Sequence, residues 1–323
     1  MFRLANIVPK AAPMTNNRDT ARAGLLYGLG AYAIWGVLPL YFKLLAGVSS
    51  TEIVAHRIIW SVVFLALLAT LWRRWGGIRA ALLSRRVMAA LVLTAMLIAA
   101  NWLIYIWAVL HEHVLAGSLG YYLNPLVNVL LGVAILKERL SRAQIGAVLL
   151  AGAGVAVLAS GAGEGLWISL SLAFSFGLYG FVRKVAPVDA LEGLAIETAI
   201  LAPVSLLWLV LLEAEGAGGF SAYPASLQAL LVIGGAVTAA PLLMFNAAAK
   251  RLPYSTLGFL QYLAPSLQLL LAVAVFGEAF TRAHAICFGA IWSALAIFAW
   301  EGVRLGRARA RRIAAEECLE PCP

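Results

Sequence analysis

The 323-residue sequence is poor in charge and in cysteine. Charged residues make up 12% of the chain, against roughly a quarter in a soluble globular protein, and 63% of the residues are hydrophobic. A chain with so little charge has to lie in a lipid bilayer. Its three cysteines, Cys287, Cys318 and Cys322, indicate neither a disulfide framework nor a metal-ligand cluster.

Motifs of catalysis are also missing. The sequence contains no Walker loop and no GxSxG, HExxH or CxxC pattern. It therefore predicts no enzyme activity, no cofactor, no metal site and no intrinsic drive from ATP.

Long apolar runs occupy most of the chain. A run of about 20 residues is long enough to cross the roughly 30 Å of hydrocarbon in a bilayer. Ten such runs cover residues 24–42, 52–72, 87–109, 114–136, 142–160, 165–182, 190–212, 228–249, 254–276 and 283–303. We predict an all-α integral membrane protein with ten transmembrane helices, an N-terminal cytoplasmic segment at 1–23 and a basic, disordered tail at 304–323.

Positive charge is concentrated in alternate loops. The net charge is +9, and 21 of the 24 lysines and arginines fall on one side of the membrane if the ten runs all cross it. The positive-inside rule then places both termini in the cytoplasm. The charge thus reflects topology, and we expect a lipid bilayer and a small-molecule solute as partners, with no nucleic acid.

The chain also contains an internal repeat of about 140 residues. The stretch 122–143 reappears at 262–283 without a gap, with ten identities in 22 positions. The informative matches are Tyr122 with Tyr262, Pro125 with Pro265, Glu138 with Glu278, and Arg142 with Arg282. A weaker match of 24–43 with 165–184 extends the repeats to 24–160 and 165–303. Since each repeat has five crossings, an odd number, we predict two five-helix repeats of opposite orientation that rock against each other in alternating access.

Few polar side chains lie inside the apolar runs, where each charged residue costs roughly 2.5–3.5 kcal/mol. Glu52 and His56 are four residues apart with Arg57 beside them, a spacing that suits a proton-linked gate. The alternative is that Glu52 neutralises Arg57 at the membrane interface. Glu197 matches His56 in the second repeat. It is a second proton candidate, or a structural residue bonded to groups such as Thr198, Ser205 or a helix end.

Amides and aromatic residues in mid-span indicate a solute cavity. Prolines in two matched runs free backbone carbonyls for a partner or a wet cavity. The alternative for the amides is hydrogen bonding between helices. The candidates for the cavity are Asn101, Trp102, Tyr105, Tyr122, Asn124, Pro125, Asn128, Asn246, Gln261, Tyr262, Pro265 and Gln268. Glu138 and Glu278 end their runs close to Arg142 and Arg282, and we expect both carboxylates to be structural.

Four segments resemble a known family. HRIIWS, NWLIYIWAV, SLGYYLNPLVNVLLG with KERLS, and TAAPLLMFNAAAKRLPYSTLGFLQYLAPSLQ are similar to the RarD proteins of the drug/metabolite transporter superfamily, with its EamA-type repeats. The resemblance covers about 24–303 and is most specific between Asn246 and Gln268. It implies ten helices and a secondary carrier of the bacterial inner membrane.

These observations favour a secondary active exporter of small metabolites or drug-like amphipathic solutes, with proton coupling as one option. A membrane-embedded lipid-processing enzyme, a flippase and a passive channel are the alternatives. Both a monomer and a homodimer stay open, because two repeats in one chain already supply a two-fold axis.

Overall fold

The computed structural model describes residues 17–45, 47–110, 114–160, 166–214, 219–275 and 282–317, and all regular elements in these ranges are helices. Their bounds are α1 Asn17–Leu44, α2 Ser50–Leu71, α3 Trp75–Leu83, α4 Arg85–Leu110, α5 Val114–Ala134, α6 Arg142–Ala159, α7 Leu166–Val185, α8 Ala190–Ala214, η3 Phe220–Ala222, α9 Ala225–Arg251, α10 Tyr254–Gln261, α11 Leu263–Ala274 and α12 Arg282–Glu317. The prediction of an all-α protein is confirmed for this part of the chain.

Seven helices of the described residues are long and apolar enough to cross a membrane, namely α1, α2, α4, α7, α8, α9 and α12. Their outward surface is apolar as well. Leu149, Val204 and Trp300 are 68, 73 and 76% exposed, which suits contact with lipid and would be unfavourable in water. The protein is therefore a multi-pass membrane protein. The remaining predicted spans correspond to α5, α6 and the pair α10 and α11, so the count of ten stays a prediction.

Three segments differ from the sequence-based expectations. The ninth predicted span is broken between α10 and α11 at Tyr262, because Pro265 lacks an N–H and its ring opposes the carbonyl of Gln261, four residues earlier. A short helix, α3, lies in the predicted loop after α2 and packs on α8. The expected disorder of the basic tail is wrong as far as Glu317, because α12 continues through an Ala- and Arg-rich stretch with high helix propensity.

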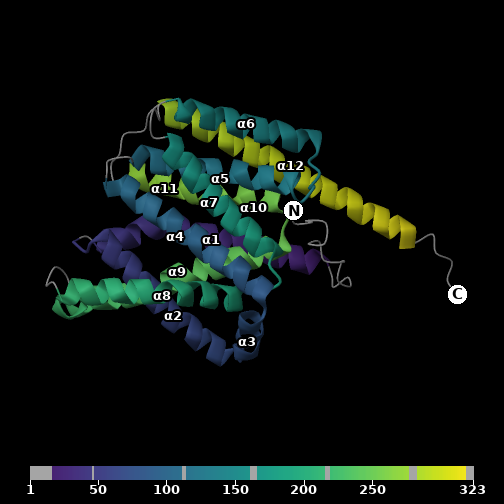
Figure 1. Ribbon diagram of the computed structural model, residues 1–323. Coiled ribbons are helices and arrows are strands. Elements are labelled where there is room, and N and C mark those ends of the chain that lie inside the picture. The colour runs from purple at the N-terminus through teal and green to yellow at the C-terminus, as the bar shows by residue number, and fades with distance from the viewer. Residues whose placement is uncertain are drawn as a thin grey trace.

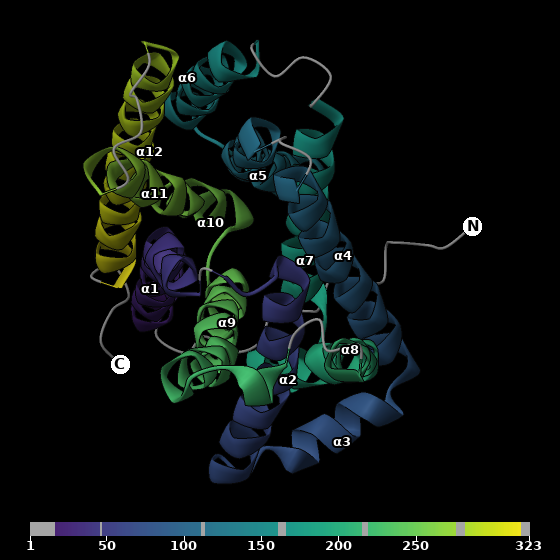
Figure 2. The same ribbon diagram turned by 90° about the vertical axis from the view of Figure 1, so that its left-hand side faces the viewer.

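The helices of the two halves are interleaved. In Figure 1, α6 and α12 lie side by side along one edge of the bundle, α2 and α8 lie at the opposite edge, and α12 extends well past its neighbours. Between these edges, α1 packs on α9 and α11, while α7 packs on α4 and α5 (Figure 2). Helices distant in the sequence thus surround the middle of the bundle.

One end of the bundle collects the basic residues that connect the helices, and we call it the basic end. There Arg74 pairs with Asp189 and Glu192, and the Lys184 ammonium donates to the carbonyl of Leu252 at 2.5 Å. Lys250 donates to the carbonyl of Ala186 at 2.7 Å. These contacts tie the start of α8 and the end of α9 to their neighbours.

Glu138 lies at the basic end as well, and it caps a helix. Its carboxylate accepts hydrogen bonds from the backbone N–H groups of Tyr254, at 2.6 Å, and Ser255, at 3.0 Å, which are the first two residues of α10. A carboxylate at a helix N-terminus satisfies otherwise unpaired donors and complements the helix dipole. No described contact joins Glu138 to Arg142, the partner that we expected for it. The matching Glu278 lies outside the described residues.

Candidate functional site

A cavity of about 350 Å³ lies among the interleaved helices, within the size range of small-molecule sites. We call it the central cavity. Aromatic rings and amides dominate its walls, and α1, α2, α4, α5, α7, α9, α10 and α11 all contribute. The lining residues are Tyr32, Trp35, Leu38, Pro39, Phe42, Arg57, Ile98, Asn101, Trp102, Tyr105, Tyr121, Asn124, Phe176, Thr238, Leu242, Gln261, Ala264, Pro265 and Gln268.

Arg57 is the one charged side chain among the described lining residues. Its Nε donates to the Thr238 hydroxyl at 2.7 Å, and its guanidinium carbon lies 5.3 Å from the ring centre of Phe42 and 5.8 Å from that of Trp102. Such contacts hold a guanidinium by cation–π attraction while leaving its outer nitrogens available. The alternative in which Glu52 neutralises Arg57 has no support among the described contacts, where Glu52 pairs with His56.

Three amides of the lining have partners. Asn101 donates to the carbonyl of Leu172 at 3.0 Å, and Gln268 donates to that of Trp35 at 3.0 Å. Gln261 accepts from Asn128 at 2.8 Å. These bonds fix the orientation of each amide at the wall.

Asn124 is different. It is 1% exposed, and neither its amide nitrogen nor its amide oxygen has a partner in the described part of the chain. A buried amide without hydrogen bonds is costly, so it calls for a ligand or an ordered water.

Seven of the twelve predicted cavity residues line the central cavity: Asn101, Trp102, Tyr105, Asn124, Gln261, Pro265 and Gln268. The other five lie in helix contacts. Tyr122 packs its ring on Phe288 and Tyr262 packs on Phe259. Pro125 lies against Gly258 of α10, Asn128 holds Gln261, and Asn246 bonds Tyr179. The α5 face that carries Pro125 and Asn128 is covered by α10, which sequence spacing does not show.

The residues that we predicted to form one gate face different parts of the structure. Glu52 lies 3.8 Å from His56 and accepts a hydrogen bond from the Tyr223 hydroxyl at 3.0 Å. The pKa of Tyr223 is raised, first by burial and then by this hydrogen bond. Arg57 follows His56 by one residue, about 100° around the helix, and faces the central cavity instead. The pair Glu52–His56 therefore faces the 220–223 segment, away from the solute space.

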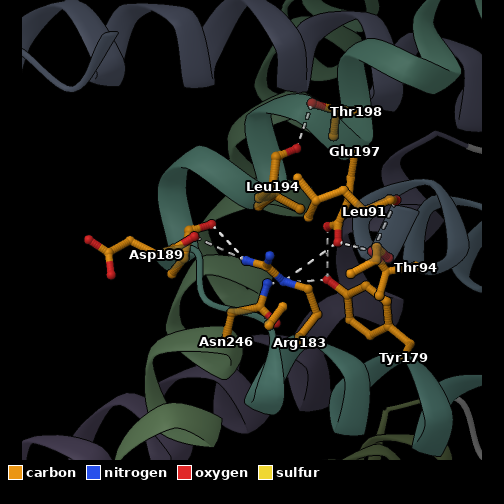
Figure 3. A network of polar contacts seen from close by, with 12 residues as sticks. Leu91, Thr94, Tyr179, Arg183, Asp189, Leu194, Glu197, Thr198 and Asn246 are labelled. Atoms are coloured by element: carbon orange, nitrogen blue, oxygen red, sulfur yellow. Dashed lines mark hydrogen bonds and ion pairs between the residues drawn. The ribbon is translucent and has the colours of Figure 1, made fainter. Parts of the chain in front are cut away.

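Glu197 belongs to a buried polar network that we call the seal, formed by Thr94, Tyr179, Arg183, Glu197 and Asn246 (Figure 3). Arg183 Nε lies 3.5 Å from the Glu197 carboxylate, and the Tyr179 hydroxyl lies 3.4 Å from it. The Thr94 hydroxyl donates to the same carboxylate. Asn246 donates to the Tyr179 hydroxyl at 3.2 Å. Residues of α4, α7, α8 and α9 thus meet in one cluster.

The sequence analysis missed three residues of the seal, namely Thr94, Tyr179 and Arg183. Arg183 was missed because it was counted with the loop charges. It is fully buried, and its second guanidinium nitrogen donates to the carbonyl of Ala190 at 3.1 Å. The partners expected for Glu197 are not used: Thr198 and Ser205 bond carbonyls of their own helix. Gly193 leaves room for this side chain, since a Cβ there would lie 1.8 Å from an Arg183 nitrogen, but a glycine in the sequence does not by itself point to Arg183.

A second hollow of about 750 Å³ opens at the basic end, and we call it the basic hollow. Its lining is Arg73, Arg74, Gly77, Ala80, Ala81, Ser84, Val87, Pro187, Val188, Asp189, Glu192 and Lys250. Along two helices, residues of the seal lie between those that line the basic hollow and those that line the central cavity.

Along α4, Val87 lines the basic hollow, Thr94 belongs to the seal and Asn101 lines the central cavity. These positions are seven apart and share a helix face. Along α9 the same order holds for Lys250, Asn246 and Leu242, which are four apart. The two hollows and the seal therefore follow one line through the bundle.

A bundle of apolar helices around a buried, solute-sized cavity is an arrangement typical of membrane transport proteins of the permease class. Sequence comparison agrees. The model of the EamA-like transporter family matches residues 22–160. An uncharacterized transporter of Vibrio cholerae is 46% identical over 92% of this chain and 99% of its own length. Protein RarD of Escherichia coli is 44% identical over 87% of this chain and 95% of its own.

The chain belongs to the EamA-like transporter family and is RarD-like within it. A more distant relative of Pseudomonas aeruginosa, 36% identical over 90% of this chain and 97% of its own, is called chloramphenicol-sensitive protein RarD. One solved crystal structure shares the fold, with a TM-score of 0.69 at 24% identity, over 88% of this chain and 99% of the other.

Proposed function

We propose that the protein is a secondary active exporter of small amphipathic solutes that works by alternating access in the bacterial inner membrane. The observation that carries this proposal is the order of basic hollow, seal and central cavity along the same faces of α4 and α9. A passive channel would need a continuous open path, whereas the buried side chains of Arg183 and Glu197 lie across this one. The absence of a Walker motif leaves a solute or ion gradient as the energy source.

The packing supports two repeats related by a two-fold axis, and the odd number of predicted crossings in each repeat is our reason for proposing that they are inverted. With a repeat of about 140 residues, α1 corresponds to α7, α4 to α9, and α5 to the pair α10 and α11. The contact of α1 with α9 then mirrors that of α7 with α4, and the contact of α1 with α11 mirrors that of α7 with α5. An approximate two-fold axis through the bundle accounts for both, and ten spans follow if α10 and α11 cross as one.

The positive-inside rule makes the basic end cytoplasmic. The central cavity lies toward the other end, since Phe42 lies near the end of α1 and Arg57 near the start of α2. Access from the cytoplasm then requires the Arg183–Glu197 pair to separate as the repeats rock. Protonation of Glu197 would neutralise one partner and favour that opening, which is our proposal for coupling to protons.

Side-specific labelling tests the proposal without knowledge of the solute. In a protein with Cys287, Cys318 and Cys322 replaced, Ala264→Cys places a thiol in the central cavity and Ala80→Cys a control thiol in the basic hollow. A membrane-impermeant maleimide should label the cavity thiol from outside and, once Arg183→Met opens the seal, from the cytoplasmic side also. The control thiol should react from the cytoplasm in both proteins.

The same assay tests the mechanism's alternatives. A cavity thiol that reacts equally from both sides with an intact seal would indicate a channel. For proton coupling, acidification should increase cytoplasmic labelling of the cavity thiol, and Glu197→Gln should remove this dependence on pH. If the pH response survives Glu197→Gln, the proton does not act at Glu197.

A further inference from the structure

We propose that the solute carries a negatively charged group, a carboxylate or a similar anion, on a small apolar or aromatic body, and that Arg57 binds this group in the central cavity. The inference rests on the proposed function for the role of the cavity in transport. It adds a chemical class of solute, which the architecture alone does not give.

The first argument is the missing counter-charge of Arg57. In the described part of the chain its hydrogen bond goes from Nε to Thr238, and no carboxylate pairs with it. The guanidinium lies over the rings of Phe42 and Trp102 within cation–π distance. The outer edge of a guanidinium carries parallel N–H donors whose spacing matches the two oxygens of a carboxylate. A charge held in place but left without a partner is suited to an anion that arrives with the solute.

The second argument is independent of Arg57. Asn124 lines the same cavity with both amide atoms unpartnered at 1% exposure, although the other described amides of the lining are bonded. An amide offers two donors and one acceptor, so it can hydrogen-bond a carboxylate oxygen, a hydroxyl or a carbonyl of a solute.

The third argument concerns the sign of the charge. The described lining contains no Asp or Glu, so nothing there would compensate an ammonium group removed from water. A cation would also be repelled by Arg57. The rest of the wall is aromatic, and Tyr105 and Tyr121 meet edge to face with ring centres 5.5 Å apart. Together with a volume of about 350 Å³, these features fit a small anion with a flat apolar body.

Four small phenyl compounds that differ in charge test the sign of the solute's charge. Phenylacetate is an anion, phenylacetamide is neutral, phenethylamine is a cation and phenylalanine is a zwitterion. Equilibrium binding to the full-length protein in lipid nanodiscs should favour phenylacetate over each of the others by at least about tenfold, because only it supplies the missing counter-charge without adding a second charge. Equal binding of phenylacetate and phenylacetamide, a preference for phenethylamine, or no binding of phenylacetate would overturn the proposal.

Variants then assign the effect to Arg57. Arg57→Gln should weaken phenylacetate binding at least about tenfold and change phenylacetamide binding less than about twofold, and Arg57→Lys should recover part of the loss. Arg251→Gln is the matched control, since it removes an arginine charge that lies outside the central cavity. If Arg251→Gln weakens phenylacetate binding as much as Arg57→Gln does, the effect is not specific to Arg57 and the proposal is wrong. Should Arg57→Gln fail to fold, the charge series on the unaltered protein still decides.

Failure of the anionic-solute proposal can be distinguished from failure of the proposed function. Binding selectivity needs no transport, and side-specific labelling needs no solute. Anion-selective binding with a thiol open to both sides would refute alternating access alone. Alternating labelling without preference for the anion would refute the anionic solute alone.

Discussion

Arg57 in the central cavity and Arg183 in the seal are both arginines inside the helix bundle, but their surroundings differ. Arg183 is fully buried beside the Glu197 carboxylate, with further bonds to the start of α8. Arg57 has aromatic rings and a hydroxyl around it and no described carboxylate partner. A paired charge fastens helices together, whereas an unpaired one at a cavity wall is available to a ligand.

The repeat explains where the difference arises. At an offset of 141, Arg183 corresponds to Phe42 and Glu197 corresponds to His56. The second repeat thus has an ion pair where the equivalent positions of the first repeat have an aromatic ring and a histidine. In the inverted arrangement that we propose, those equivalent positions lie toward the other end of the bundle, which is also the end nearer to the central cavity.

The largest effect should come from removing the cation of the seal. Arg183→Met leaves the Glu197 carboxylate buried without its partner, which we expect to lower the free energy of unfolding by about 3–5 kcal/mol. Replacing both residues, as Arg183→Met with Glu197→Leu, should restore most of the loss, since no charge is then stranded. Thermal unfolding in detergent measures both. A double variant as unstable as the single one would show that the pair is not the cause.

A smaller loss of stability is expected when a methyl group is added next to the same arginine. Gly193→Ala places a Cβ 1.8 Å from an Arg183 nitrogen, so Arg183 must move, at a cost of about 1–3 kcal/mol. The control is Gly289→Ala in α12, where nothing lies within 4 Å of the added Cβ and helix propensity improves. Gly193→Ala should unfold at lower temperature than the unaltered protein, and Gly289→Ala should not. Equal melting temperatures of the two variants would contradict the packing of Arg183 on Gly193.

The next effect concerns the N-terminal cap of α10, the helix that carries Gln261 of the cavity wall. Glu138→Ala removes the acceptor of two N–H groups and should cost about 1–2 kcal/mol. Hydrogen exchange at Tyr254 and Ser255 should speed up, while exchange in α8 stays unchanged. If exchange accelerates throughout the bundle instead, Glu138 is a general stability determinant and not a local cap.

The smallest effect is expected at Glu52, which lies outside both the central cavity and the seal. Glu52→Gln keeps an acceptor for the Tyr223 hydroxyl and should change stability by less than about 1 kcal/mol. It should also leave the pH dependence of cavity labelling intact. Loss of the pH response in Glu52→Gln would indicate that the proton binds at the pair Glu52–His56 and not at Glu197.

The amino-acid sequence predicted the all-helical membrane class and seven of the nineteen residues that line the central cavity, because these follow from composition and from rare residue types in apolar runs. Asn101, Trp102 and Tyr105 share a sector of one helix, and α4 presents that sector to the cavity. The same reasoning failed for Asn128 and Asn246, which have equally suitable chemistry. Whether an amide faces a cavity or another helix depends on the neighbour across the contact, which a single helix does not specify.

The amino-acid sequence by itself determined that the chain lies in a bilayer, which end of each span is basic and that two related halves are present, because hydropathy, charge and repetition are properties of the linear chain. The tertiary structure decided which charges meet. Arg57 and His56 are neighbours in sequence and face different surroundings, while Arg183 and Glu197, on separate helices, form one buried pair. Ion pairs and cavities require side chains of different helices to come within a few ångströms, and only the packing of the helices brings them there.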